Sequence, residues 1–507
     1  MSLALASRRA AISPAWVKNP LWRTARAVPS LDLPFADTKS LADAVTGQSL
    51  VTFTRASSGT YVGSDGLIKT ATTNLLLRSE EIGTSPWGTN VSGSVTYTAN
   101  AVASPTGTVT ADRVTATADF AGPNQFVSVI SGLSYTLSFY IKAVSAGVKD
   151  QIRIEFFSGR FAQFRISTLA FSGVNAGITT TSAQVVGDGW VRVALTALAP
   201  STGSLASAVY ANTDADFYLW GAQLEQSSTV GEYIPTTSTI NSAPRFDHNP
   251  TTGESLGLLV EEQRTNSIRN NTMVGAVAGT PGTAPTNWAI TSTANGITRE
   301  IVGTGTENGI TYVDLKYSGT ASTATNISLA FEGNAQIVAA QNDVWSISLY
   351  AKLVSGSWAN TAFAIFVNSY TSGGVFDALG TSLVSTYANP TSAALQTQRY
   401  TARATLSSAT TARVNGGLFS SIANGATIDF TLRIGLPQLE QGAFATSVIP
   451  TSTATVTRSA DVASITGANF SSWYRQDEGT VFAGGSSFDA RTNDGIFLAV
   501  FDDNSIS

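Results

Sequence analysis

The chain of 507 residues has a mass of 52.7 kDa, a length that favours three or four domains over a single core. Only 12% of the residues are charged and the net charge is −5, which argues against a nucleic-acid-binding surface over the whole chain. The absence of cysteine excludes disulfides and thiolate metal sites, and no apolar run approaches the roughly 20 residues of a membrane span.

Residues 1–45 form a basic, irregular segment. Every charged side chain before Asp32 is positive, and two tryptophans interrupt a stretch that contains proline. Two interpretations are open: a disordered basic tail, or an arm that orders against a partner protein. The second is favoured because two tryptophans in a free tail would expose apolar surface. The predicted anchors of this arm are Arg8, Arg9, Trp16 and Trp22. The N-terminus lacks the apolar core of a secretion signal, so we expect the protein to leave its cell by another route.

From Val51 onward, short alternating segments are separated by turn dipeptides. Asp65-Gly66 lies between two such segments and predicts a β-hairpin within 46–72. Helical periodicity is nearly absent, and residues 40–45 could form at most a turn or two of helix. The sequence therefore predicts an all-β protein.

The strongest internal signal is a repeat. Gln-Leu-Glu-Gln at 223–226 recurs at 438–441, and Ile-Pro-Thr at 234–236 recurs at 449–451, with the same offset of 215 (438 − 223 and 449 − 234). Upstream matches have smaller offsets: Tyr135 with Trp345 and Trp190 with Tyr400 at 210, Trp87 with Trp288 at 201, and Asn74 with Asn266 at 192. Loop insertions between shared strands would produce this drift.

Residues 135–143 show the alternation of a half-buried strand, which the second copy repeats. The predicted inward-facing residues are Tyr135, Leu137, Phe139 and Ile141, and in the second copy Trp345, Ile347, Leu349 and Ala351. The predicted fold is all-β, with tandem jelly-roll β-sandwich modules joined by β-hairpin linkers and preceded by an irregular N-terminal arm. The expected boundaries are 1–45 for the arm, 46–72 and 241–264 for the linkers, and 73–240 and 265–455 for the modules.

The segment between the modules predicts a hairpin whose turn is opened by Asn249-Pro250 and closed by Thr252-Gly253. Three charged residues follow in an otherwise charge-poor chain: Glu261, Glu262 and Arg264. A structural salt-bridge cluster is the favoured interpretation, and a ligand site is the alternative. His248, the only histidine, is interpreted as a structural residue of this turn rather than as a base.

Three segments resemble parts of tailed-bacteriophage virion proteins. APRFDHNPTTGESLGLLVEEQRTN at 243–266 closely resembles a segment of phage tail-fibre and other virion proteins, where it precedes carbohydrate-binding-module-like or concanavalin-like sandwiches. TFTRASSGTYVGSDGLI at 52–68 resembles the companion segment, and SSWYRQDEGTVFAGG at 471–485 resembles the opening strands of their concanavalin-like lectin domain. The resemblance implies carbohydrate-binding-module-like sandwiches, the incomplete start of a lectin domain at 456–507, and a place on the phage tail or another external appendage.

No nucleophile–base–acid set is found, and a single histidine excludes histidine-based triads and multi-histidine metal sites. Glycoside hydrolysis needs only two carboxylates, but Glu225 and Glu440 occupy equivalent repeat positions, which favours a shared structural role. No loop has the spacing of acidic residues that a Ca²⁺ site needs, so no cofactor is predicted. No enzymatic activity is predicted either. The flat faces of tryptophan rings can pack on the C–H faces of pyranose rings, which makes tryptophans candidate sugar contacts. The alternative is that they pack in the protein core. The candidate glycan-binding residues are Trp87, Trp190, Trp220 and Trp288.

Three classes of function remain open. A tail-fibre adhesin that attaches the phage to host-cell glycans is favoured over a purely structural head-fibre, collar or decoration protein, and over a capsule depolymerase. The expected partners are other virion proteins, reached through the N-terminal arm, and host surface polysaccharide. Neither nucleic-acid binding nor membrane insertion is expected. A homotrimer is expected because multivalency raises the avidity of weak sugar sites, although the chain has no coiled-coil heptads.

Overall fold

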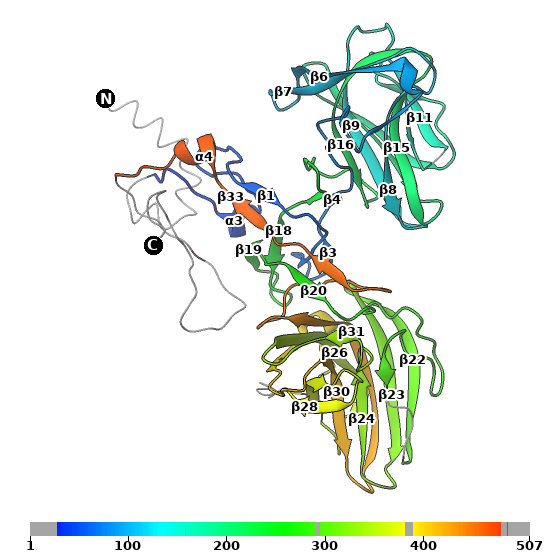
Figure 1. The fold of residues 1–507 in the computed structure, drawn as a ribbon, viewed down its shortest axis with the longest axis vertical. Helices are drawn as coiled ribbons and strands as arrows, with labels where there is room; N and C mark the ends of the chain where they lie inside the picture. Colours follow the sequence, from blue (N-terminus) through cyan, green and yellow to red (C-terminus); the bar gives the residue numbers. More distant parts are fainter. Residues whose placement is uncertain are drawn as a thin grey trace. The chain divides into compact units, whose positions relative to one another are not determined.

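The computed structural model of the protein describes residues 28–477 and Gly484, except for positions 158, 291–294, 363 and 381–388. The described chain forms two compact units, the first made of 54–58 and 70–244 and the second of the remaining residues. Each unit contains a sandwich of antiparallel strands (Figure 1). No helix in the described part of the chain is long and apolar enough to cross a membrane.

The first sandwich consists of two six-stranded sheets. Sheet 1 contains, in spatial order, β12 (Ala170–Ser172), β11 (Arg160–Arg165), β10 (Gln151–Phe156), β15 (Gly203–Ala211), β8 (Gly122–Val129) and β5 (Gly88–Asn90). Sheet 2 contains β13 (Ile178–Gly187), β14 (Trp190–Leu198), β9 (Ser134–Ala143), β16 (Ala215–Glu225), β7 (Val109–Ala116) and β6 (Val95–Ala103). A short 3-10 turn (Ser92–Ser94) precedes β6, and β4 (Thr73–Asn74) pairs with β17 (Asn241–Ser242).

Alternating side chains of the two sheets form one apolar core. In β9 the buried residues are Tyr135, Leu137, Phe139 and Ile141, as the alternation predicted, and they pack with Ile152, Ile154 and Phe156 of β10. Burying one such side chain stabilises the fold by roughly 1.5–3 kcal/mol. With few charges and no disulfides in the chain, this packing is the main source of stability.

The second sandwich, within the second unit, follows the same plan. Sheet 3 contains β28 (Phe376–Leu379), β27 (Ala364–Tyr370), β30 (Arg413–Ile422), β24 (Thr325–Ala330) and β21 (Ala289–Ile290), and β25 (Ile337–Val338) also pairs with β30. Sheet 4 contains β29 (Arg399–Thr405), β26 (Val344–Ser357), β31 (Thr427–Gln441), β23 (Ile310–Thr320) and β22 (Ile297–Glu307), with a 3-10 turn (Leu395–Thr397) before β29.

The central strands of sheets 2 and 4 have the same order, and the repeated motif has the same register in both. β9 lies between β14 and β16, and β26 lies between β29 and β31. The Gln-Leu-Glu segment of β16 pairs with 136–138, and that of β31 pairs with 346–348, which keeps the offset of 210 found in the sequence. Two copies of one jelly-roll sandwich therefore account for the repeat.

The repeated motifs meet at a set of buried polar side chains, here called the clasp: Asn74, Gln223 and Thr236 in the first sandwich, and Asn266, Gln438 and Thr451 in the second. Each asparagine is fully buried and makes four hydrogen bonds to backbone groups. Asn74 Nδ2 donates to the carbonyls of Ala222 and Ile234, while its Oδ1 accepts from the N–H groups of Leu76 and Leu224. Asn266 makes the same bonds with Pro437, Ile449, Ile268 and Leu439.

The glutamine and threonine of each clasp complete it. Gln223 Oε1 accepts from the N–H of Ile234, and Gln438 Oε1 accepts from that of Ile449. The threonine hydroxyl donates to the carbonyl of Leu76 or Ile268. Because buried backbone groups need partners, each clasp ties the chain segment just before its sandwich to the last strand of that sandwich.

One match of the sequence comparison was wrong. Trp190 was aligned with Tyr400 at an offset of 210, whereas the structure makes Arg192 and Arg399 equivalent at 207 (399 − 192). Arg192 donates to Ser138 Oγ and stacks on Tyr140, and Arg399 donates to Ser348 Oγ and stacks on Tyr350. The turn before β14 contains Asp188 and Gly189, both at positive φ. Aligning the two aromatic residues gave the wrong offset between β14 and its counterpart in the second sandwich.

The rest of the second unit, here called the hairpin region, consists of 28–53, 59–69, 245–264 and 456–477. Its paired strands are β2 (Thr60–Val62) with β3 (Ile68–Thr70), β18 (Arg245–His248) with β19 (Ser255–Leu259), β1 (Thr52–Thr54) with β33 (Val462–Ser464), and β20 (Arg264–Asn266) with β32 (Val456–Arg458). Two short helices, α3 (Phe35–Thr38) and α4 (Gly467–Ser471), complete it. Gly66 and Gly253 adopt positive φ at the two predicted turns.

The ends of the chain are only partly described. Arg8, Arg9, Trp16 and Trp22 lie outside the described residues, as does most of the predicted lectin start. Within 28–45, Asp43 is the one buried residue, and its carboxylate accepts hydrogen bonds from the N–H groups of Asp32, Val45 and Thr46. This part of the predicted arm therefore has no apolar core of its own.

Candidate functional site

The four tryptophans predicted to bind glycans are all buried. Trp190 and Trp220 are 1% and 2% exposed and pack against Tyr140 and Tyr233 on the outer side of sheet 2. Their indole N–H groups donate to the carbonyl of Ala103 and to Thr110 Oγ1, both at 3.1 Å.

Trp87 and Trp288, each 7% exposed, lie in the two apolar cores. Their indole N–H groups donate to the carbonyls of Arg78 and Asn270 at equivalent positions of the two copies. None of these four tryptophans has a ring face open to a sugar. Their burial favours the alternative interpretation, packing in the protein core, over sugar stacking.

The repeated glutamates also bind their own chain. Glu225 Oε1 accepts from the N–H of Gly231 (2.8 Å) and from Gln223 Nε2, while Glu440 accepts from the N–H and the hydroxyl of Thr446. Burial raises the pKa of Glu225. The shared structural role predicted from their positions agrees with these bonds.

Glu261 belongs to a buried ionic cluster in the hairpin region. Arg245 and Arg458 each lie 2.8 Å from Glu261 Oε2, and Arg245 also pairs with Asp461. All four side chains are at most 1% exposed. Of the three charged residues singled out in the sequence, only Glu261 enters this cluster, because Arg264 pairs with Glu262 nearer the surface.

His248 and Asp247 attach one hairpin to another. His248 Nδ1 lies 3.0 Å from the carbonyl oxygen of Val62, and Asp247 Oδ1 accepts from the Val62 N–H at 2.7 Å. Both residues lie at the end of β18, against β2. His248 therefore has a structural role, and it lies at the end of β18, just before the turn of this hairpin.

A different set of residues gathers on the outer face of sheet 1. Core residues alternate along β10 with Arg153 and Glu155, which point away from the core, and the registers place Tyr210 and Gln163 on either side of Arg153. Phe161 lies opposite Glu155. We call this set the sheet-1 face: Phe120, Asn124, Phe126, Arg153, Glu155, Phe161, Gln163 and Tyr210.

Arg153 is the centre of the sheet-1 face. Its guanidinium carbon lies 3.4 Å from the ring centroid of Phe161 and 4.7 Å from that of Phe120, so the cation is held between two aromatic rings. Arg153 Nε donates to Glu155 at 2.7 Å, and Glu155 also accepts from the N–H of Gly159. These contacts hold the guanidinium over the Phe161 ring.

The edges of the sheet-1 face remain accessible. Phe126 is 63% exposed and Phe120 is 39% exposed. Between Phe126 and the Arg153 group, β15 contributes only Ala206 and Ala208 to this face. Burial raises the pKa of Tyr210, whose hydroxyl accepts from Asn124 Nδ2. Tyr210 therefore stays neutral and can donate a hydrogen bond.

The corresponding face of sheet 3 has a different chemistry. Its outward residues include Phe366, Asn368 and Tyr370 of β27, and Phe376 on β28 is 54% exposed. Asn368 Oδ1 is buried without a hydrogen-bond partner. Among the described residues of that face, no arginine stacks on a phenylalanine. The two copies share their clasps but not their outer faces.

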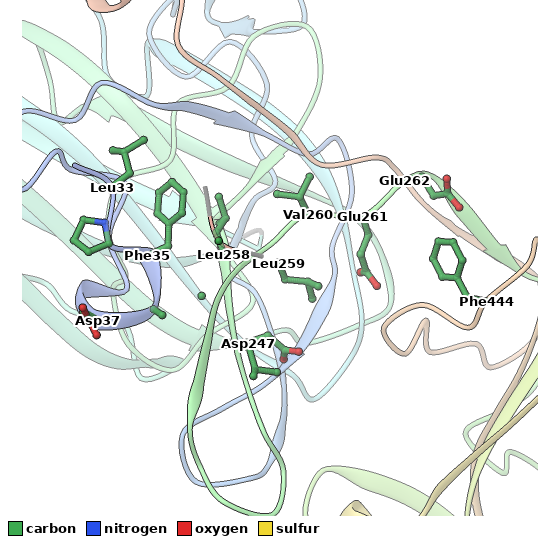
Figure 2. Close-up of a pocket in the computed structure, with 15 residues that line it drawn as sticks. Leu33, Phe35, Asp37, Asp247, Leu258, Leu259, Val260, Glu261, Glu262 and Phe444 are labelled. Atoms are coloured by element: carbon green, nitrogen blue, oxygen red, sulfur yellow. The ribbon is translucent and has the colours of Figure 1, made fainter. Parts of the chain in front are cut away.

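A cavity of about 600 Å³ is lined mainly by the hairpin region, together with Phe444 from the loop after β31. Figure 2 shows Leu33 and Phe35, from the segment around α3, on the side opposite Glu262 and Phe444, with β19 and the residues after it between them. Burial raises the pKa of Asp247 at its wall, against the opposing effect of the Val62 N–H. Across the part of the chain that the structure describes, no three acidic or histidine side chains gather as a metal site would require.

No family model and no curated protein matches the chain. Among solved structures, it is similar to the N-terminal CBM22-1–CBM22-2 tandem domain of Paenibacillus barcinonensis Xyn10C, with 16% identity and a TM-score of 0.24 over 78% of this chain and 98% of that one. It is also similar to the CBM22-1 xylan-binding domain of the same protein, with 15% identity and a TM-score of 0.20 over 35% of this chain and 94% of that one. Similarity at this level assigns no ligand.

Proposed function

We propose that the protein is a non-enzymatic, glycan-binding adhesin of a phage virion, and that the sheet-1 face is its glycan site. The observation that carries the proposal is the Arg153 guanidinium held between Phe120 and Phe161 beside Glu155. A pyranose ring presents C–H groups that pack on aromatic faces and hydroxyls that bond to planar polar side chains. The sheet-1 face offers both kinds of contact on rigid strands.

Affinity electrophoresis of the full chain tests the glycan site, with xylan, mixed-linkage β-glucan or a bacterial capsular polysaccharide dissolved in the gel. A polysaccharide that retards the chain should do so about tenfold less after Phe126→Ala or Gln163→Ala, a loss of about 1.4 kcal/mol. Phe376→Ala is the matched control, because Phe376 is similarly exposed but lies on sheet 3. Equal loss in the control, or no loss in either variant, would contradict the site.

The resemblance of 52–68, 243–266 and 471–485 to segments of phage virion proteins supports a place in the virion. The proposal expects residues 1–27 to dock on another virion protein. A chain without these residues should be folded and soluble yet absent from purified particles. Normal incorporation would refute docking through this segment. Release of reducing ends from a retarded polysaccharide would instead identify a depolymerase.

We further expect a homotrimer, because three weak glycan sites in one oligomer raise its avidity for a polysaccharide without any new contact. Light scattering at micromolar concentration measures the mass of the purified chain. A single species near 53 kDa would count against the trimer. If no polysaccharide retards the chain in any oligomeric state, a purely structural virion role becomes the better explanation.

A further inference from the structure

The cavity of the hairpin region has an acidic wall. The described residues that line it include four carboxylates, Asp37, Asp247, Glu261 and Glu262, and no lysine, arginine or histidine. Glu261 is already neutralised by two buried arginines, and Glu262 is half exposed beside Arg264. Asp247 accepts backbone N–H groups and Asp37 is exposed. Asp37 and Asp247 belong to neither of these ion-pair groups and leave the wall acidic, which favours a cationic occupant.

The other part of the wall is apolar. Leu33, Phe35, Leu258 and Phe444 contribute to it, and Val260 at the rim is 52% exposed. A volume of about 600 Å³ lies within the range of cavities that hold groups of several side chains. The occupant that fits this chemistry is a peptide segment that carries both aromatic and basic side chains.

Two stretches of the chain lie mostly outside the described residues, and their charges distinguish them. Gly484 of residues 478–507 is itself part of the cavity lining, but this stretch contains five acids and only one arginine, so an acidic wall would repel its charged side chains. Residues 1–27 contain five basic residues, no acid and two tryptophans. They also end six positions before Leu33, which itself lines the cavity. From Leu33 back to Trp22 the chain can span up to about 35 Å, enough to cross such a cavity.

We propose that the cavity is the binding site for residues 1–27 of the same chain, with the region of Trp22 and Arg23 against its acidic and apolar walls. This assignment does not depend on the glycan site. Binding in the cavity and docking on another virion protein are then competing states of one segment. A partner protein would have to offer this segment a better site than the cavity does.

Engineered thiols test the position directly, because the chain has no cysteine of its own. The full chain with Leu21→Cys and Val260→Cys should form an internal disulfide on mild oxidation, identified by peptide mass. The matched control pairs Leu21→Cys with Val338→Cys, whose position is 71% exposed and outside the cavity. No link, or equal linking in both chains, would overturn the proposal. A disulfide between two chains would overturn its same-chain assignment.

Trypsin provides an independent readout, because residues 1–27 contain five cleavage sites. Neutralising the wall with Asp37→Asn and Glu262→Gln should speed cleavage at these sites about fivefold at low salt. The difference should shrink at high salt, where exposed charges are screened. Glu254→Gln is the control, since Glu254 is exposed on the same hairpin but does not line the cavity. Equal cleavage of the neutralised and control chains would refute charge-based binding.

Discussion

Replacing the clasp asparagine should destabilise one sandwich and leave the stability of the other unchanged. In Asn74→Ala, the carbonyls of Ala222 and Ile234 and the N–H groups of Leu76 and Leu224 all lose their side-chain partner. At about 1 kcal/mol for each bond, the free energy of unfolding should fall by about 4 kcal/mol. That is a large part of the roughly 5–15 kcal/mol that stabilises an ordinary domain.

The assay must resolve the two sandwiches, because a chain of two units need not unfold in one step. Hydrogen exchange followed by mass spectrometry along a urea series does so. Asn74→Ala should lower the urea midpoint of peptides from 70–244, and Asn266→Ala should lower that of peptides from 266–451. Asn175→Ala is the control, because half-buried Asn175 accepts one side-chain bond, from the N–H of Gly177. A change below about 1 kcal/mol in Asn74→Ala, or an equal effect on both units, would refute the clasp.

Three further predictions concern the buried ionic cluster, a buried tryptophan and a close strand contact. Glu261→Gln should destabilise the second unit by about 3–5 kcal/mol in urea melts, because Arg245 and Arg458 would keep their buried charge with one partner fewer. Burial alone would raise the pKa of Glu261, but the two arginines and the bonds from Ser447 outweigh it and hold the pKa below its ordinary value. Folding therefore favours the ionised form of Glu261. Its contribution to the free energy of unfolding should be complete above the pKa that Glu261 has in the unfolded chain, and lost as the pH falls through its pKa in the folded chain. Equal midpoints of acid unfolding for the wild type and Glu261→Gln would contradict this. Trp220→Ala should cost about 3–5 kcal/mol yet leave polysaccharide retardation of the folded chain unchanged, whereas a selective loss of retardation would restore the tryptophan as a ligand contact. Gly122→Ala should lower the melting temperature of the first unit, since the added Cβ would lie 2.2 Å from a backbone carbonyl oxygen of β15, and an unchanged melt would show that the two strands can separate.

The fold could be predicted from the sequence because its strongest constraints repeat. Alternation in 135–143 and 345–351 marked the core faces, and the match of Asn74 with Asn266 and the Gln-Leu-Glu-Gln repeat fall on the two clasps. These motifs satisfy buried backbone groups, so both copies need the same side chains at the same places. The mismatch at Trp190 arose because it was aligned with Tyr400, although Trp190 lies on the outer face of its sheet and Tyr400 faces the core.

The candidate site could not be predicted, because its members are far apart in the sequence. Residues from Phe120 to Tyr210 meet only through the pairing of β8, β15, β10 and β11. A signal was present in Gln-Ile-Arg-Ile-Glu-Phe at 151–156, where charged and apolar residues alternate. The tryptophans drew attention instead, although a large indole with a bonded N–H is well suited to a core.

The ionic cluster shows the same limit in the hairpin region. Glu261 was visible as part of a charged run, but its partners Arg458 and Asp461 lie about 200 positions away. Nothing in the run itself distinguishes Glu261, which turns inward, from Glu262, which pairs near the surface. Long-range register decides which of two adjacent acids is buried.

Comparison of the two copies separates stability from recognition. The positions that both copies share bind backbone groups: Asn74 and Asn266 do so in the clasps, and Arg192 and Arg399 donate to carbonyls of the loop after the last strand. The positions that differ lie outward on sheets 1 and 3, where Arg153 and its aromatic partners have no described counterpart in the second copy. A repeated residue must meet a requirement common to both sandwiches, and packing is that requirement. A ligand that only one sandwich binds would place its contacts among the residues that do not repeat, which is where the sheet-1 face lies.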